Sequence, residues 1–171
     1  MIERLQEQLL RKFKQDWFND INRNTALRPG GGGNKLRTYR LFKRDFSCEQ
    51  YLQNVIVPSH RKAYAQFRCG VAPIRLETGR FERLPLQQRT CEHCDNQSIE
   101  TEEHVLLICP LYEDLRNELF DIIESEHVNF RNWSNVDKLC IILGSHNSSI
   151  IINSAKICKL ILDRRKRFLY R

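Results

Sequence analysis

The stretch Cys91-Glu92-His93-Cys94, followed after nine intervening residues by His104-Val105-Leu106-Leu107-Ile108-Cys109-Pro110, decides how the rest of the chain is organised. A C-x2-C pair presents two thiolates from one tight turn, and a downstream His and Cys add two further soft or borderline ligands. Three thiolates and one imidazole can close a tetrahedral structural zinc site. The sequence therefore predicts that one Zn²⁺ ion is bound by Cys91, Cys94, His104 and Cys109.

His93, inside the C-x2-C turn, is the competing ligand, but it would leave His104 without a role, so we interpret it as a solvent-exposed spacer. A catalytic zinc keeps one coordination position open for water and has a general base nearby. Four protein ligands would fill that position, and neither the H-E-x-x-H pattern nor the zinc-deaminase pattern occurs in the sequence. We therefore expect a structural metal in a chain that is not an enzyme, with no catalytic residues and no small-molecule substrate.

The net charge of the 171-residue chain is +7, and the charges are unevenly distributed. Residues 1–90 carry 18 basic and 8 acidic side chains, residues 91–130 carry 1 and 11, and residues 131–171 carry 9 and 2. Basic segments attract polyanions. The charge does not identify the polyanion, but we expect any phosphate contact to come mainly from the two basic arms and not from the acidic segment that holds the metal ligands.

The cysteine content indicates the compartment. Seven cysteines are an odd number, and the chain begins with no apolar signal segment. In a reducing compartment a C-x2-C pair is more often a metal or redox site than part of a disulfide framework. No apolar run approaches the length of a membrane span. We expect an intracellular protein, nuclear or cytoplasmic or both, without a membrane partner.

Hydrophobic residues recur every three or four positions through most of the chain, which is typical of amphipathic helices. Helices are expected at 2–21, 34–46, 49–55, 58–69, 110–123, 135–143 and 148–168, whereas Pro73, Gly79 and Pro85 favour turns over 71–89. The prediction is an all-α domain stapled by a single zinc knuckle. Its segments are an amphipathic N-terminal helix (1–28), a flexible glycine-rich joint (29–34), a basic helical segment (35–90), the zinc knuckle with the following helix (91–127) and a C-terminal helical segment with a basic end (128–171).

Three single side chains carry further expectations. Trp17 is predicted to anchor the first helix in the core, and Arg68 to point away from the core on the 58–69 helix. Arg89 directly precedes the metal turn, where its guanidinium would contact a phosphate or pair with an acid such as Glu100. The structural pairing is the favoured interpretation for Arg89.

Two basic clusters are candidate phosphate contacts. One is a helix face in 34–46, opposite a face formed by Tyr39, Phe42 and Phe46, and the other lies at the end of the last helix. The alternative for the first cluster is a solvated face over a packed aromatic stripe, and the second also suits a helix C-terminus or a nuclear-targeting receptor. The predicted contact residues are Lys35, Arg37, Arg40, Lys43, Arg44, Arg164, Arg165, Lys166 and Arg167.

Four stretches, at 35–43, 75–81, 89–94 and 99–116, together resemble the C-terminal tail of non-LTR (LINE-like) retrotransposon reverse transcriptases. The most specific part is the C-x2-C turn joined to Glu100-Thr101-x-x-His104-x4-Cys109-Pro110. The resemblance implies a zinc-binding and nucleic-acid-binding module that lies behind the polymerase and holds template RNA or target DNA during target-primed reverse transcription. It also implies the same four zinc ligands, Cys91, Cys94, His104 and Cys109.

The chain departs from the enzymes of that family in two places. It has no Tyr-x-Asp-Asp or similar pair of aspartates for two-metal polymerase chemistry. After the knuckle it also lacks the Pro-Asp and acid-x-Lys residues with which some relatives form a nuclease. The resemblance therefore implies a non-catalytic module, with a reverse-transcriptase body as a candidate partner.

A protein–protein interaction module is the alternative prediction. The acidic stretch from Glu92 to Glu126 would then dock a basic partner, such as the body of a polymerase. A RING-type ligase is a weaker version, because it needs eight ligands for two metals and only four residues are spaced correctly.

Overall fold

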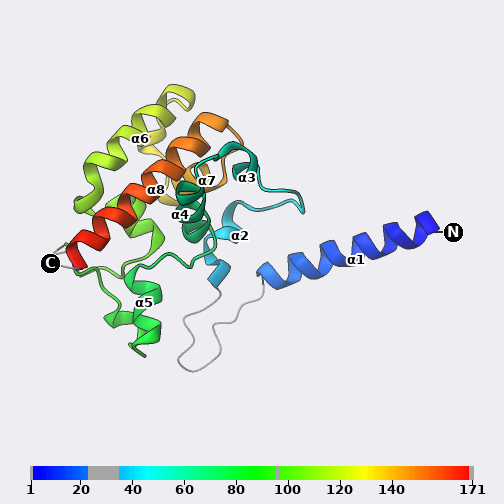
Figure 1. The fold of residues 1–171 in the computed structure, drawn as a ribbon, viewed down its shortest axis with the longest axis horizontal. Helices are drawn as coiled ribbons and strands as arrows, with labels where there is room; N and C mark the ends of the chain where they lie inside the picture. The colour runs from blue at the N-terminus through cyan, green and yellow to red at the C-terminus, as the bar shows by residue number, and fades with distance from the viewer. Residues whose placement is uncertain (1, 23–34, 95–96, 170–171) are drawn as a thin grey trace.

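The fold is described from a computed structural model, which covers residues 2–22, 35–94 and 97–169 (Figure 1). No strand occurs in these ranges, and the only β-pairing is an isolated antiparallel bridge between Thr90 and Ile99. The all-α prediction is therefore confirmed for this part of the chain. The glycine-rich joint predicted at 29–34 lies outside it.

Eight α-helices lie in the described ranges, and most of them begin and end close to the expected positions. They are α1 (Ile2–Asn22), α2 (Tyr39–Phe42), α3 (Gln50–Asn54), α4 (Pro58–Arg68), α5 (Arg75–Phe81), α6 (Glu113–Glu126), α7 (Asn135–Gly144) and α8 (Ser148–Leu169). Shorter 3-10 turns occur at Lys35–Arg37, Leu86–Gln88, Pro110–Tyr112 and Phe130–Asn132, and a π-helical turn at His104–Ile108. None of the described helices is long and apolar enough to cross a membrane.

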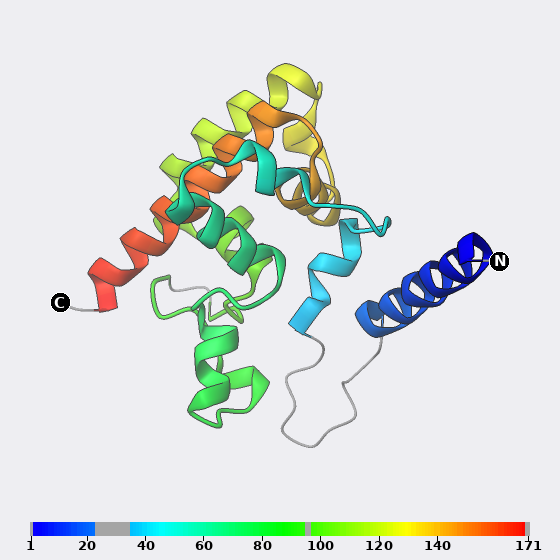
Figure 2. The same ribbon diagram turned by 45° about the vertical axis from the view of Figure 1, so that its right-hand side comes forward.

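Helix α8 is the centre of the hydrophobic core. It packs against α4, α6 and α7, and Figure 2 shows α4 and α6 on different sides of it. Its buried positions recur every three or four residues, so one long face of the helix is covered by its neighbours. These positions include Ile150, Ser154, Ile157, Ile161 and Arg165. The opposite sides of the core come from large buried side chains such as Tyr64 and Phe67 of α4 and Ile123 of α6.

Helix α1 projects from the body of the molecule and touches it only near its C-terminal end (Figure 1). Ile21 is buried, and the ring of Trp17 packs edge-on against Phe46 with 5.6 Å between the centroids. Trp17 is thus half-buried at a local contact. The prediction that it anchors the first helix in the core is wrong. Farther along the helix, Leu5 and Phe13 are more than 60% exposed.

The helix predicted at 34–46 is shorter in the structure. It breaks into a 3-10 turn and the one-turn helix α2, after which Lys43 adopts an extended conformation. Tyr39 and Phe42 still share a face, with their ring centroids 5.6 Å apart, but Phe46 leaves that face and packs on Trp17. The aromatic stripe therefore divides between the body and α1.

Arg68 is buried beside aromatic rings of α2 and α3. Its guanidinium is buried, lies 4.6 Å from the ring centroid of Phe42 and 4.9 Å from that of Tyr51, and donates to Glu49 and to the carbonyl oxygen of Leu143. Cation–π contacts of this kind are strongest when the cation is desolvated. The prediction that Arg68 points outward is therefore wrong.

Within 71–89, where the sequence favoured turns, Arg75–Phe81 forms the helix α5, and bends and turns flank it. Gly79 lies inside this helix, and a Cβ at this position would come within 2.8 Å of Cγ of Arg89. The glycine that weakened the helical pattern is thus needed for the close approach of a side chain. Arg89 is buried, and its guanidinium donates to the carbonyl oxygens of Leu76 and Leu84. Arg89 thus has a structural role, but the groups that it binds are backbone carbonyls and not the side chain of Glu100.

Candidate metal centre

Two backbone pairings hold the C-x2-C turn in place. The amide N–H of Cys91 donates to the carbonyl oxygen of Ser98 at 2.9 Å, and the N–H of Glu100 donates to that of Arg89 at 3.0 Å. Together with the Thr90–Ile99 bridge, these bonds make a short antiparallel ladder that begins just before the first ligand. The ladder directs the chain from the C-x2-C turn straight into the segment that carries the other two ligands.

The second pair of ligands comes from one unusually wide helical turn. The hydroxyl of Thr101 accepts a hydrogen bond from the N–H of His104 at 3.1 Å, which caps the start of the turn. The N–H of Cys109 then donates to the carbonyl oxygen of His104 at 2.7 Å, a π-helical pairing. In an α-helix, residues five apart point about 140° away from each other. One turn that spans five residues instead brings His104 and Cys109 to the same side.

The four predicted ligands converge in the structure. One ligand atom from each of Cys91, Cys94, His104 and Cys109 can be chosen so that all four lie within 4.8 Å of one another. Nε2 of His104 lies 3.4 Å from Sγ of Cys94, and Sγ of Cys91 lies 4.0 Å from Sγ of Cys109. Cys91, His104 and Cys109 are buried, and Cys94 is half-buried. The arrangement could hold a metal ion.

Burial shifts the protonation of the cluster toward neutral side chains. Burial raises the pKa of Cys91 to about 12 and also raises the pKa of Cys109 above its ordinary value. Burial, and then the neighbouring guanidinium of Arg116, lowers the pKa of His104. The histidine is therefore neutral, while thiolates in this buried cluster would need a compensating positive charge. A divalent ion, if bound, would supply that charge and displace the thiol protons.

His93 lies outside the cluster of ligand atoms, although it occupies the same turn as two of them. Its ring is half-buried and packs against Phe168 near the end of α8, with 5.8 Å between the ring centroids. Burial and the charge of Arg165 lower its pKa. His93 is thus a packing residue between the turn and α8, and not the exposed spacer that was predicted.

A buried ion pair directly behind the cluster was not foreseen. Glu100 is fully buried, its Oε1 lies 3.9 Å from Sγ of Cys91, and it accepts hydrogen bonds from the Arg165 guanidinium and the Arg75 backbone N–H. Arg165 also donates to the carbonyl oxygen of Pro73 at 2.9 Å. The signal in the sequence was the position of Arg165, four residues after Ile161 on the apolar face of α8.

Four of the nine residues predicted to contact phosphate form ion pairs inside the protein. Arg37 binds Glu102 with two nitrogens, at 2.6 and 3.1 Å, and Glu77 with the third at 3.1 Å. The other pairs are Lys43 with Glu49, Arg164 with Asp114, and Arg165 with Glu100. Because Arg165 is only 3% exposed, it cannot reach a phosphate in this structure. The contact role predicted for Arg165 is replaced by a structural one.

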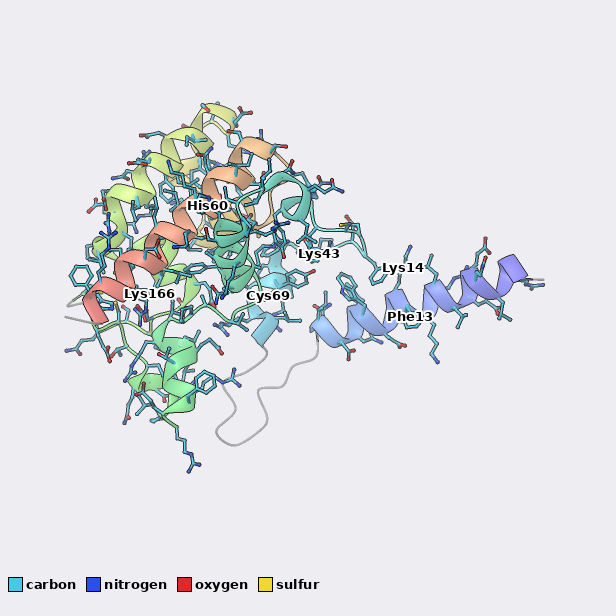
Figure 3. The ribbon with its side chains drawn as sticks, in the orientation of Figure 1. Phe13, Lys14, Lys43, His60, Cys69 and Lys166 are labelled. Atoms are coloured by element: carbon cyan, nitrogen blue, oxygen red, sulfur yellow. The ribbon has the colours of Figure 1, made fainter. Side chains whose placement is uncertain are left out.

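The remaining predicted contacts are accessible. Arg44, Lys166 and Arg167 are exposed and Arg40 is half-buried, and none of the four forms an ion pair with another described residue. Figure 3 shows Lys166 on the far side of the body from Lys14 and Lys43. The two basic arms are therefore separate surfaces. The side chain of Lys35 lies outside the described part of the structure.

The fold and the cluster define a helical domain with a buried Cys3His site. No family model matches the chain, and no match is found among curated proteins or solved structures.

Proposed function

We propose that Cys91, Cys94, His104 and Cys109 hold one structural Zn²⁺ ion. Bonds of about 2.3 Å to sulfur and about 2.0–2.1 Å to nitrogen give tetrahedron edges of about 3.8 Å between sulfurs and about 3.6 Å between sulfur and nitrogen. Two of the six edges compare directly: Sγ of Cys91 and Sγ of Cys109 are 4.0 Å apart, and Sγ of Cys94 and Nε2 of His104 are 3.4 Å apart, while all four atoms lie within 4.8 Å of one another. Four protein ligands leave no position for a reacting water, so the ion would staple the fold.

Metal analysis of the purified chain tests this proposal. We expect about one zinc per chain, its removal by a chelator, and a lower melting temperature for the metal-free chain, because metal binding is coupled to folding. Cys94→Ser should lose the metal, whereas Cys48→Ser, at an exposed cysteine away from the cluster, should keep it. Full zinc occupancy in Cys94→Ser would remove Cys94 from the ligand set.

We also propose that the domain stabilised by this metal site binds RNA or DNA without catalysing a reaction. The resemblance to the zinc-binding tail of non-LTR retrotransposon reverse transcriptases supports this function, and so does the net charge of +7. One observation carries it: Arg40, Arg44, Lys166 and Arg167 stay accessible without an ion pair among the described residues, although neighbouring basic residues are paired. Cations left available in this way can bind phosphates along a nucleic-acid backbone.

A salt titration of binding tests this function. Each lost phosphate contact should reduce the slope of log affinity against log salt by about 0.7 for a single strand and about 0.9 for duplex DNA. Charge reversal of Arg40 and Arg44 should therefore weaken binding and flatten that slope. The matched control is charge reversal of Lys62 and Lys156, which are exposed on α4 and α8 and give the same change in net charge. No binding at low salt, or equal effects of the two double variants, would contradict the proposal.

The alternative function, docking of a basic protein by the acidic segment, finds less support. Much of that segment is engaged by the chain's own cations: Glu100 by Arg165, Glu102 by Arg37, and Asp114 by Arg164. Arg131 also reaches Asp121 and Glu124 on α6. A basic partner would have to compete with these internal ion pairs.

A further inference from the structure

A groove lies where α1 meets the segment after α2. A hollow of about 430 Å³ has Arg11, Lys14 and Phe18 on one side and Arg44 and Phe46 on the other. A second hollow of about 330 Å³ adjoins it across Trp17 and Phe46, which line both. Figure 3 labels Lys14 on α1 and Lys43 on the opposing segment, one on each side of this groove.

The aromatic side chains of the groove are unusually accessible. Phe18 is 47% exposed and Phe46 is 46% exposed, while Trp17, which contacts Phe46, is half-buried. The Trp17–Phe46 contact is edge-on, at 72° between the ring planes, so the two rings present surfaces in different directions. Exposed aromatic rings that line a hollow often mark a binding site.

The charges of the groove complement a polyanion. Arg11, Lys14 and Arg44 are exposed and form no ion pair within the described ranges. Asp45 is the acidic side chain that lines the same hollow. Glu49, which lines the adjoining hollow, is already paired with Lys43 and Arg68. A protein helix seated here would need acidic side chains of its own to pair with these cations, because burying them unpaired is costly, and charged residues are depleted at the centres of protein interfaces.

We propose that this groove takes a single strand of nucleic acid, with bases stacked on Phe18 and Phe46 and phosphates held by Arg11, Lys14 and Arg44. This inference rests on the proposed nucleic-acid-binding function and specifies the form of nucleic acid that the α1 side of the molecule recognises. Aromatic platforms in a cationic groove bind single strands because every unpaired base offers a face for stacking. The bases of a duplex are already stacked, so a duplex would be left with the phosphate contacts alone.

Fluorescence anisotropy with labelled oligo-U, oligo-dT and a duplex of matched length, about 12 nucleotides, tests the proposal. We expect both single strands to bind more tightly than the duplex. Phe46→Ala should weaken single-strand binding by at least about fivefold and leave duplex binding unchanged. The control is Phe81→Ala, which removes an aromatic ring that is 84% exposed on α5, away from the groove.

Two additional measurements distinguish the loss of base stacking in Phe46→Ala from a change in the placement of α1. Phe18→Ala leaves the Trp17–Phe46 contact intact and should weaken single-strand binding in the same way. The chain has two tryptophans, so Trp133→Phe leaves Trp17 as the single tryptophan, and oligo-U should change the tryptophan emission. Stacking beside Trp17 is the physical reason for the expected change.

The outcomes separate this inference from the function on which it rests. Equal binding of single strands and duplex, unaffected by Phe18→Ala and Phe46→Ala, would overturn the groove and leave nucleic-acid binding in place. No binding of any oligonucleotide would overturn both. If the two phenylalanine variants change the oligomeric state of the chain and not its affinity for oligonucleotides, a second copy covers the groove and the proposal is wrong. A preference between oligo-U and oligo-dT would show whether the strand is RNA or DNA.

Discussion

Replacing Arg165 by Met should destabilise the protein strongly, although the residue lies in the cluster of basic residues at the end of the chain. The substitution removes a charge and keeps an unbranched side chain of similar length. Glu100 would then be a fully buried carboxylate beside Cys91 that keeps the hydrogen bond from the Arg75 backbone N–H but has lost its counterion. A buried charge without a partner is among the most costly defects in a folded protein.

The size of the effect follows from the choices open to Glu100. It can remain charged without its partner, which typically costs about 3–5 kcal/mol, or it can bind a proton. Its ordinary pKa is 4.5, so protonation at pH 7 costs about 3.4 kcal/mol at about 1.36 kcal/mol per pH unit. The cheaper route sets the expected loss at about 3 kcal/mol. For a chain of this size that corresponds to a melting temperature lower by about 6–12 °C.

The sign of the pH dependence provides a second test. Glu100 in the unfolded chain titrates near its ordinary pKa, whereas burial without Arg165 raises its pKa in the folded variant. Where the folded variant holds Glu100 protonated, the penalty therefore grows with pH above the unfolded pKa, and it shrinks by about 1.4 kcal/mol for each pH unit by which the solution is acidified toward that value. The difference between Arg165→Met and the unchanged chain should be smaller at pH 6 than at pH 7.

Thermal unfolding followed by circular dichroism, with saturating zinc and measured metal content, gives both quantities. Arg167→Met is the matched control, because Arg167 is exposed, and it should change the melting temperature very little. Adding Glu100→Gln to Arg165→Met should recover much of the loss, since no charge then remains buried. The reasoning fails if Arg165→Met and Arg167→Met melt alike, or if the deficit of Arg165→Met grows as the pH falls.

Three further predictions concern single contacts. Arg164 holds the pKa of Asp114 at about 2, so an NMR titration of this carboxyl should have its midpoint there. In Arg164→Met the midpoint should return toward 3.8. The stability that this ion pair contributes is fully present above pH 3.8 and is lost as the pH falls through about 2. Gly79→Ala should destabilise the chain by about 1–3 kcal/mol in a urea titration despite the better helix propensity of alanine, because the new Cβ would meet Cγ of Arg89 at 2.8 Å. Thr101→Ala removes the acceptor for the His104 N–H and should cost about 1 kcal/mol by the same measurement, while an unchanged midpoint would show that the cap is unimportant.

The metal ligands and the long helices could be predicted from the sequence because their signals are local. The ligands follow from the spacing of Cys91, Cys94, His104 and Cys109, and the structure brings all four together. Helices α4, α6, α7 and α8 follow from hydrophobic residues at helical spacing and from capping signals. Gly70, expected to end α4, has a φ of 64°, which a glycine adopts easily.

The misses arose where a distant residue decides the local conformation. Helix α5 was not expected, because Gly79 weakens the helical pattern and nothing nearby reveals that Arg89 needs the space. Arg165 lies in a run of basic residues, which is typical of a protein surface. Its partner Glu100, which explains its burial, lies 65 positions earlier in the chain. Arg68 is held by aromatic rings from α2, α3 and α4, which no spacing rule connects.

The charge pattern of the sequence also has a different meaning in three dimensions. Separate basic and acidic segments suggested surfaces for two kinds of partner. In the structure, Arg37 from the first basic segment and Arg164 and Arg165 from the last one bind carboxylates of the acidic segment between them. Part of the net charge of each segment is thus neutralised within the fold, and the number of available cations is smaller than the sequence implies.

The ion pair between Glu100 and Arg165 imposes an order on events during synthesis. At about 5–20 residues per second, a ribosome makes Arg165 about 3–13 s after Glu100. Once Cys109 has been made, all four candidate metal ligands are present, but the carboxylate behind them still lacks its counterion. A nascent chain that stops before residue 165 would therefore have the complete candidate metal site and yet stay loosely packed around Glu100. The knuckle would pack tightly against the rest of the domain only after the last turns of α8 have been synthesised.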